Sequence, residues 1–361
     1  MRIVDWSERA GRADGGPAVV LLDQRALPRR TEYLHLATVD GLVDAIRALA
    51  VRGAPNLGIA GAFGVALAAH HHPDDPATVH DEAERIAHAR PTAVPLALGA
   101  RRALARLDDG PAAVLAEARA VAADAARVNA AATARAADLL QELHPEGPLR
   151  TLTVCNTGEL ACGVGGTALG AVLRLHERGA LVEVLACETR PLLQGSRLTV
   201  WELARAGAPH RLCVDSAGPA AIATGRVDAV LVGADRIAAN GDVANKIGTY
   251  MLACAAARSG VPFLVVAPEE TIDPRTATGD DIVVEERDPG EVLELGGTPT
   301  TLPVTPVYNP AFDVTPFELV TAIVTEDRAW SARPPQRGPS ASPTQTARVS
   351  ERSLPRVSRT S

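Results

Sequence analysis

The chain has 361 residues, of which 47% are hydrophobic, 22% are charged and only 3% are aromatic. A chain of this length suits two domains, and their cores must be packed mainly by Ala, Val and Leu. The formal net charge of −7 argues against a protein that binds nucleic acid or an anionic membrane surface.

The sequence also bears on cellular location. No run of 18 apolar residues and no apolar N-terminal segment occurs, so we expect neither a membrane span nor a signal peptide. The five cysteines are odd in number and have no CxxC spacing. They predict a reduced, cytoplasmic protein without a disulfide framework or a zinc site.

Residues 1–125 predict a small mixed α/β domain that is mostly helical. It begins with a short β-meander over residues 1–37, which includes strands near 18–23 and 31–36. Amphipathic or small-residue spacing then predicts helices over 39–51, 58–69, 78–90 and 95–107. We expect His70, His71 and His72 to form a solvated loop. A long alanine-rich helix over 111–143 is predicted to bridge to the next domain.

Residues 126–330 predict a Rossmann-like domain, because strands and helices alternate from Thr151 onward. This fold class is a doubly wound parallel sheet. Its strands are expected at 152–154, 181–186, 211–214, 229–232 and 262–267, with an additional edge strand near 282–287. Helices are expected at 164–178, 194–206, 219–224, 243–258 and 317–324. Residues 331–361, rich in Arg, Ser and Pro, predict a disordered tail.

Polar residues follow several of the predicted strands. They lie at Cys155–Gly158, Glu188–Pro191, Asp215–Ser216 and Gly233–Asp235. Because ligands bind beyond the carboxyl ends of parallel strands, we expect these loops to line one crevice. The glycines at 163, 165, 166 and 170 do not match the GxGxxG spacing, so a dinucleotide cofactor is not expected.

The stretch from Leu231 to Tyr250 combines the strongest candidates for chemistry. Asp235 follows an apolar strand, and Asn245 with Lys246 is expected at the start of a helix, where backbone amides and an ammonium group can bind an anion. Lys246 is the only lysine among 36 basic residues, which indicates a pocket that needs a compact ammonium group rather than a planar guanidinium. The alternative is a solvated lysine retained by chance.

Cys155 is the candidate thiol. At a strand-to-helix turn it can be ionised by the helix N-terminus and act as nucleophile or base, although a buried inert cysteine fits its position equally well. Arg52 and Arg90 each stand at the end of a predicted helix; Arg52 lies three residues before Pro55, and Arg90 directly precedes Pro91. A Cys and an Asp flanked by Arg, Gln and Lys, without a set of metal ligands, suit proton transfer on a phosphorylated small molecule.

Six blocks resemble the methylthioribose-1-phosphate isomerase family. Its wider superfamily includes regulatory subunits of the translation-initiation guanine-nucleotide exchange factor and an archaeal ribose-1,5-bisphosphate isomerase. The matching blocks are RGAPNLGIAGAFG (52–64), ARPTAV (89–94), CNTGELACGVGGTALG (155–170), ETRPLLQGSRLTVWEL (188–203), GADRIAANGDVANKIGTY (233–250) and NPAFDVTP (309–316).

The resemblance implies an aldose–ketose isomerase of methionine salvage. Such an enzyme opens the ring of 5-methylthio-ribose 1-phosphate and forms 5-methylthio-ribulose 1-phosphate. By motif position, Asp235 corresponds to the proton donor and Cys155 to its partner at the reacting carbon. The implied substrate-binding residues are Arg52, Gly53, Ala54, Arg90, Gln194, Asn245 and Lys246. The resemblance also implies a homodimer that uses neither a metal nor a nucleotide.

Some positions depart from the family pattern. Asn56 replaces a small apolar residue, Glu159 is an additional acid, Pro95 replaces an Asn, and residues 215–218 lack a Met. A related substrate such as 5-deoxyribose 1-phosphate or ribose 1,5-bisphosphate therefore stays open, as does a non-catalytic regulatory subunit. Sequence does not choose between proton transfer and a hydride shift from C2 to C1.

Overall fold

The N-terminal part of the chain pairs a small sheet with a group of helices. The computed structural model describes residues 3–9, 16–90 and 93–331, so all but Ser331 of the predicted tail lies outside the described residues. The strands β1 (Val4–Ser7), β2 (Ala18–Leu22) and β3 (Tyr33–Leu36) form an antiparallel sheet, which confirms the predicted meander. The helices that follow are α1 (Val39–Arg47), α2 (Ala54–His71), α3 (Pro76–Ala87) and α4 (Val94–Leu104).

Helix α2 is the centre of this part, and it is buried along most of its length because small residues let its neighbours approach closely. A Cβ atom on Gly99 of α4 would lie 2.0 Å from the carbonyl oxygen of Gly58, so only glycine permits this helix contact. Two predictions are wrong here. Helix α1 ends at Arg47 rather than Val51, and His70 and His71 belong to the last turn of α2 rather than to a loop.

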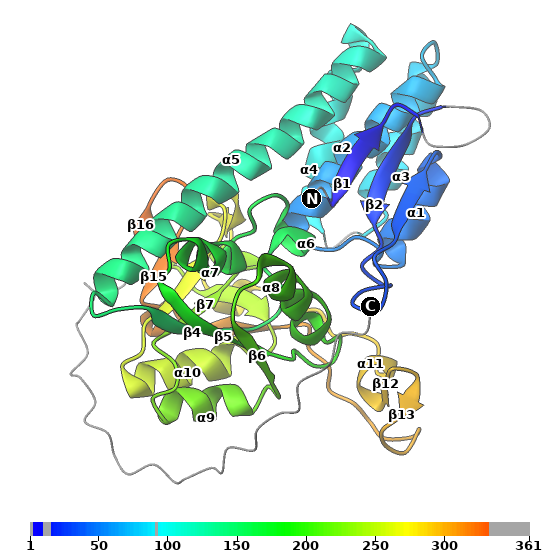
Figure 1. Cartoon of the computed structure of the whole chain (residues 1–361). Coiled ribbons are helices and arrows are strands. Elements are labelled where there is room, and N and C mark those ends of the chain that lie inside the picture. The colour runs from blue at the N-terminus through cyan, green and yellow to red at the C-terminus, as the bar shows by residue number, and fades with distance from the viewer. Residues whose placement is uncertain (1–2, 10–15, 91–92, 332–361) are drawn as a thin grey trace, which may run out of the picture.

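Helix α5 (Pro111–Leu143) runs diagonally from the N-terminal helices to the sheet (Figure 1). Val114 and Ala118 are buried in the N-terminal core, whereas Ala132 and Leu140 are buried against the sheet. The predicted bridging helix is therefore confirmed. We propose that the boundary between the two domains falls inside this helix, near residue 125.

A seven-stranded sheet forms the C-terminal part, in the order β16-β15-β10-β7-β4-β5-β6. All neighbouring strands are parallel except β15 and β16. The predicted Rossmann-like class is confirmed. The strands are β4 (Leu149–Thr153), β5 (Leu181–Cys187), β6 (His210–Cys213), β7 (Ala229–Val232), β10 (Phe263–Val266), β15 (Ala322–Val324) and β16 (Ala329–Trp330).

Helices cover both faces of this sheet, as its alternating side chains require. In β7, Ala229 and Leu231 contribute to the core on the side of α5 and α7, whereas Val230 and Val232 contribute to the core on the side of α9 and α10 (Figure 1). The short helices α6 (Glu159–Cys162) and α8 (Val200–Ala206) lie nearer the N-terminal part. The other covering helices are α7 (Ala168–Glu177), α9 (Ala217–Ala223) and α10 (Thr249–Ser259).

A second, four-stranded sheet was not predicted. It has the order β11-β8-β9-β14 and comprises β11 (Ile272–Asp273), β8 (Arg236–Ala238), β9 (Val243–Lys246) and β14 (Phe312–Thr315). The predicted helix over 243–258 is thus wrong in its first part, because residues 243–246 form β9 and α10 begins only at Thr249. The strand pairing of Lys246 with Phe312 explains the difference, since it satisfies backbone groups that a helix would have used.

Two further predictions are wrong near the C-terminal end. Residues 282–287 form no strand, and only Glu286 makes an isolated bridge to Pro310. Residues 317–324 form a single 3-10 turn (Phe317–Leu319) and then β15, which pairs with β10 instead of continuing as a helix. Between them, α11 (Gly290–Leu293), β12 (Glu294–Leu295) and β13 (Thr298–Pro299) form a projecting arm (residues 283–308; Figure 1). Among the described residues, no helix is long and apolar enough to cross a membrane.

Candidate active site

The order of the strands brings Cys155 and Asp235 to the same edge of the sheet. From β4 the chain proceeds to β5 and β6 on one side, and then returns to β7 and β10 on the other. The topological switch point therefore lies between the neighbouring strands β4 and β7, and it is where ligands bind in such sheets. Cys155 follows β4 and Asp235 follows β7, so both candidates flank the switch point.

Asp235 follows β7 and combines an exposed side chain with close protein surroundings. Its side chain is exposed, yet protein surrounds it closely enough that desolvation raises the pKa of its carboxyl group. The nearby charges of Lys246, Arg52 and Arg90 oppose this rise in pKa. A carboxyl group that is exposed and whose pKa is raised toward its protonated form is suited to donate a proton.

Cys155 is held in an unusual backbone conformation. Its φ angle of 66° lies in the left-handed region, which is uncommon for a residue with a side chain. Its N–H donates to Oγ1 of Thr189 at 2.8 Å, and its carbonyl oxygen accepts from Oγ1 of Thr199 at 2.6 Å. Thr189 is itself held by Asp215, whose carboxylate accepts from its N–H at 2.8 Å. These contacts hold the backbone of Cys155 in this conformation and so set the direction of its Cα–Cβ bond.

Of the two alternatives for Cys155, an ionised thiol and a buried one, the structure favours a thiol that is not ionised. Burial raises the pKa of Cys155, and Asp235 raises it further, although Lys246 and Arg52 oppose the rise. The thiol is therefore neutral at physiological pH. The same interactions show that Asp235, Lys246 and Arg52 are close enough to act on Cys155 electrostatically. Cys187, the other thiol at a strand end, is fully buried opposite Cys213 of β6.

The segment Arg52–Ala54 meets Gln194 at the entrance to α2. The Gln194 amide is oriented so that both its oxygen and its nitrogen form hydrogen bonds. In this orientation the oxygen accepts from Nη2 of Arg52 at 3.1 Å, and the nitrogen donates to the carbonyl oxygen of Thr189 at 3.2 Å. Gly53 has a φ angle of 84°, and a Cβ atom there would lie 2.0 Å from the carbonyl oxygen of Ala161. Only glycine fits both the conformation and the space. Ala54 begins α2, so the positive end of that helix faces this region.

Lys246 and Asn245 stand on β9. Nζ of Lys246 donates to the carbonyl of Ala311 at 2.8 Å and lies 4.6 Å from the ring centroid of Phe312. Asn245 is buried and donates to Oγ1 of Thr249 at 2.8 Å. The contacts of Lys246 with Ala311 and Phe312 arise from the unpredicted second sheet, in which β9 pairs with β14.

The predicted anion site at the start of α10 is wrong, because that helix end is already occupied. The carboxylate of Asp313 accepts from the N–H groups of Gly248 at 2.7 Å and Tyr250 at 3.1 Å. Burial nevertheless raises the pKa of Asp313 to about 6. The candidates that remain for binding an anionic group are therefore the cationic side chains and the N-terminus of α2.

Sequence reasoning missed two cations beside Arg52. The charges of Arg197 and Arg287 both lower the pKa of Arg52, so they lie near it. Arg287 forms ion pairs with Glu291 and Glu285, and nothing in the sequence marked it. Arg197 lies within the matching block 188–203, and its guanidinium donates to the carbonyls of Gln24 and Leu192. Among the described residues, no group of three His, Cys, Asp or Glu side chains is arranged to hold a metal ion.

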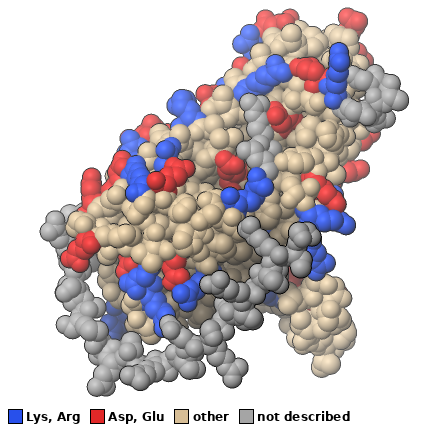
Figure 2. Space-filling view, viewed as in Figure 1, with Lys and Arg blue, Asp and Glu red and all other residues tan. Residues whose placement is uncertain are grey.

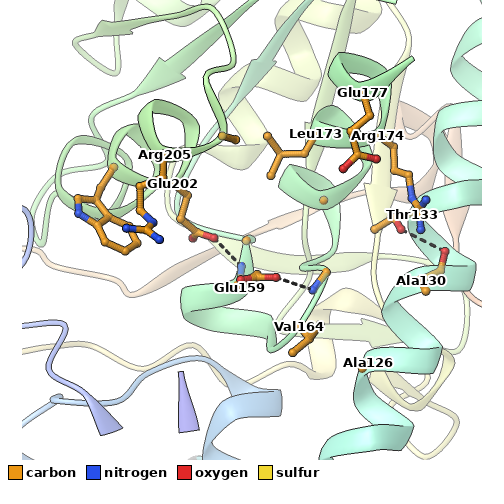
Figure 3. Close-up of a pocket in the computed structure, with 15 residues that line it drawn as sticks. Ala126, Ala130, Thr133, Glu159, Val164, Leu173, Arg174, Glu177, Glu202 and Arg205 are labelled. Atoms are coloured by element: carbon orange, nitrogen blue, oxygen red, sulfur yellow. Dashed lines mark hydrogen bonds between the residues drawn. The ribbon is translucent and has the colours of Figure 1, made fainter. Parts of the chain in front are cut away.

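A separate groove of about 460 Å³ lies behind the Cys155 segment, between α5, α7 and α8 (Figure 3). Gly158, Glu159 and Glu202 line it, together with Arg174 and Arg205. None of the predicted site residues lines this groove, so it is distinct from the site described above.

Comparison with known proteins gives consistent results. The model of the initiation factor 2 subunit family matches residues 50–331. The chain is 58% identical over 313 residues to a probable bifunctional methylthioribose-1-phosphate isomerase/methylthioribulose-1-phosphate dehydratase of Nocardia farcinica, and covers 86% of itself but only 57% of that protein. It is 46% identical over 337 residues to a methylthioribose-1-phosphate isomerase of Pseudomonas syringae pv. syringae, covering 90% of itself and 91% of that protein.

Two solved structures are similar over almost the whole fold. One is translation initiation factor eIF-2B, subunit delta, from A. fulgidus, with a TM-score of 0.82, 39% identity and coverage of 92% of this chain and 96% of that chain. The other is 5-methylthioribose 1-phosphate isomerase from Pyrococcus horikoshii OT3, with a TM-score of 0.82, 37% identity and coverage of 92% of both chains.

Proposed function

The chain belongs to the initiation factor 2 subunit family and, within it, to the methylthioribose-1-phosphate isomerases, and we propose that its crevice carries out that isomerisation. The reaction converts 5-methylthio-ribose 1-phosphate, an aldose, into 5-methylthio-ribulose 1-phosphate, a ketose. The observation that carries the proposal is the pairing of Cys155 and Asp235 across the switch point, with Lys246 and Arg52 acting on both.

Asp235 supplies the proton that opens the ring. Because C1 carries a phosphate, the ring cannot open by simple hemiacetal chemistry, and the ring oxygen must be protonated as the C1–O bond breaks. The raised pKa of Asp235 favours the protonated carboxyl group that this step needs. Opening leaves positive charge at C1, and Asp235 becomes the carboxylate that later accepts the proton of the C2 hydroxyl.

The hydrogen on C2 must then move to C1. The thiol of Cys155 is neutral and is therefore a poor base for removing that hydrogen as a proton. We propose that the hydrogen shifts directly from C2 to C1 with its electron pair, while Cys155 lies against the reacting carbon. Loss of the C2 hydroxyl proton to Asp235 completes the ketone, so atoms and charge balance and the enzyme returns to its starting state.

The phosphate group is the anchor of the substrate. Arg52, Arg90 and Lys246 are cationic and lie within electrostatic range of Asp235, and none of the three has a carboxylate ion-pair partner among the described residues. Gly53 and Ala54 contribute the N-terminal end of α2, while Gln194 and Asn245 contribute hydrogen-bonding amides. Compact phosphate recognition by such groups follows from their charge and geometry.

Two alternatives receive less support. A ribose-1,5-bisphosphate isomerase needs a further free cation for the second phosphate, but Arg287 is paired with two glutamates and Arg197 is bound to backbone carbonyls. A non-catalytic regulatory subunit does not require a proton donor and a thiol at the same switch point. The identity of 46% with an isomerase over 91% of that protein favours the enzyme.

Turnover of purified protein with 5-methylthio-ribose 1-phosphate, followed by NMR beside an equal concentration of ribose 1,5-bisphosphate, tests this proposal. We expect kcat/KM for the first sugar to be at least ~10²-fold higher than for the second, because the second phosphate of ribose 1,5-bisphosphate would have no cationic partner in the site. Turnover of neither sugar would contradict the proposed function. Preferred turnover of the bisphosphate would replace its substrate.

We also propose a cytoplasmic homodimer. The projecting arm has apolar side chains that are largely exposed in the single chain, with exposed fractions of 93% for Val283, 87% for Val304 and 81% for Tyr308. It carries few charges on the face that Figure 2 shows. Such surface is typical of interfaces between chains. Light scattering after gel filtration should give twice the chain mass of 37.5 kDa, and a monomer mass would contradict the dimer.

A further inference from the structure

The segment that carries Cys155 is held by a buried carboxylate that the proposed chemistry does not use. Glu202 of α8 is 8% exposed, and its two oxygens accept hydrogen bonds from three donors of the segment. Oε1 accepts from Nδ2 of Asn156 at 2.8 Å and from the N–H of Leu160 at 3.3 Å, and Oε2 accepts from the N–H of Glu159 at 2.7 Å. Figure 3 shows the Glu202 carboxylate directed at this loop from the wall of the groove.

The packing around this carboxylate is tight. A Cβ atom on Gly158 would lie 2.4 Å from one Glu202 oxygen and 2.5 Å from the other, so glycine at 158 leaves the space that the carboxylate occupies. Since Glu202 has two acceptor oxygens for three donors, an amide at this position would place an NH2 group against a donor. The ionised carboxylate can therefore accept from all three donors, whereas an amide of similar shape has only one acceptor oxygen.

Thr199 acts on the same segment from one turn earlier. It is fully buried in the π-helical turn Gly195–Thr199 that precedes α8. Its hydroxyl donates to the carbonyl oxygen of Cys155 at 2.6 Å and accepts from Nδ2 of Asn156 at 3.2 Å. Asn156 thus links Thr199 to Glu202, and both residues stabilise the left-handed backbone of Cys155. Such π-turns occur frequently at functional sites.

The N-terminal domain holds the opposite side of this segment. Asn56 of α2 donates to the carbonyls of Glu159 and Leu160, each at 2.9 Å, and Gln24 also donates to the carbonyl of Leu160. These contacts restrain the segment after Gly158. They do not reach Cys155 itself. Among the described residues, the carbonyl oxygen of Cys155 accepts a side-chain hydrogen bond only from Thr199.

We propose that Glu202 and Thr199 are positioning residues that hold the Cys155 thiol in the direction needed at the reacting carbon. The proposal rests on the isomerase function proposed above. Neither residue touches the substrate in this account. They act through Asn156 and the Cys155 backbone, and their loss lets the strained residue relax toward an ordinary conformation. The hydrogen then shifts more slowly from C2 to C1, while substrate binding by Arg52, Arg90 and Lys246 is retained.

Paired variants separate positioning from folding. Thr199→Val keeps the shape of the side chain but removes the hydroxyl, whereas Thr199→Ser keeps the hydroxyl. Glu202→Gln keeps the shape but introduces the mismatched NH2 group. Asp228→Asn is the structural control, because Asp228 likewise accepts a backbone N–H, from Arg150 at 2.7 Å, but precedes β7 at the opposite edge of the sheet.

We expect kcat for 5-methylthio-ribose 1-phosphate to fall about tenfold in Thr199→Val and Glu202→Gln, with KM changed less than about threefold, because a misplaced catalytic group affects the transition state more than binding. Thr199→Ser should restore most of the wild-type kcat. Alkylation of Cys155 by iodoacetamide, followed by peptide mass spectrometry, should change in rate in the two impaired variants and not in Asp228→Asn.

Unchanged kcat in Thr199→Val would overturn the proposal, as would an equal loss of kcat in Thr199→Ser. A loss of kcat that only parallels the loss of thermal stability across all variants, with no change in the alkylation of Cys155, would also overturn it. If Glu202→Gln does not fold, the Thr199 pair decides the outcome. Failure of the wild-type protein to convert the sugar would refute the proposed function instead, and the alkylation rates would still test whether these residues position Cys155.

Discussion

Glu202 should make the stability of the protein depend on pH near neutrality. Burial raises its pKa to about 7 from an ordinary value of 4.5, despite three hydrogen bonds that favour the ionised form. Because the folded state holds this proton more tightly than the unfolded state, stability is greatest below the unfolded pKa and falls as pH rises through the folded pKa. The rise from 4.5 to about 7, at about 1.4 kcal/mol for each pKa unit, corresponds to a loss of about 3 to 4 kcal/mol in the free energy of unfolding.

Urea denaturation at a series of pH values between about 5 and 8 measures this effect. We expect the free energy of unfolding of the wild type to fall by about 2–3 kcal/mol more than that of Glu202→Gln across this range, because the amide does not titrate. Asp313→Asn is a matched comparison, because Asp313 has a pKa of about 6. This variant should lose the part of the pH-dependent stability that falls away up to about pH 6, and it should keep the part near pH 7 that Glu202 contributes. Parallel curves for wild type and Glu202→Gln would refute the reasoning.

Three other predictions concern the crevice. Gly53→Ala should lower the melting temperature and raise KM more than Gly110→Ala does. Both glycines have positive φ angles, but of the two only Gly53 has a carbonyl oxygen 2.0 Å from the position of the added Cβ. Equal effects of the two substitutions would refute the steric argument. Lys246→Arg should raise KM at least about tenfold, because a planar guanidinium does not fit where the Lys246 ammonium lies 2.8 Å from the carbonyl oxygen of Ala311. A KM equal to that of the wild type would show that a positive charge alone suffices. Reaction in D2O should leave C1 of the product without deuterium by NMR, because the Cys155 thiol is neutral, whereas deuterium at C1 would establish proton transfer.

The main sheet could be predicted from sequence because its strands are short apolar runs separated by helical spacing. Alternation along β7 places Leu231 and Val232 in different cores, as expected for a sheet covered on both faces. The rule that ligands bind beyond the carboxyl ends of parallel strands then brought Cys155 and Asp235 into one candidate site. The strand order, which makes β4 and β7 neighbours, came only from the structure.

The second sheet could not be predicted because its pairing is long-range. Lys246 pairs with Phe312, and neither segment is long enough to be recognised as a strand alone. The apolar spacing after Val243 fits a helix equally well, and the choice depends on a partner strand supplied from far along the chain. For the same reason, sequence did not reveal that Asp313 occupies the N-terminus of α10.

The electrostatics of the site also depend on the fold. A strand-to-helix turn suggested an ionised Cys155, but the helix that follows has only four residues and burial dominates. Asn56 and Glu159, noted as departures from the family pattern, both have partners in the structure: Asn56 binds two carbonyls of the Cys155 segment, and Glu159 accepts from the N–H of Gly165. Burial and partners of this kind arise from residues distant in the chain.

The most direct test of the whole account is the turnover of 5-methylthio-ribose 1-phosphate by Asp235→Asn, with substrate affinity measured on the same preparation by calorimetry. The variant keeps the shape of the side chain but has no proton to give to the ring oxygen. We expect kcat to fall at least ~10²-fold while Kd stays near that of the wild type, the usual scale for loss of a general acid. Turnover close to that of the wild type would contradict the account.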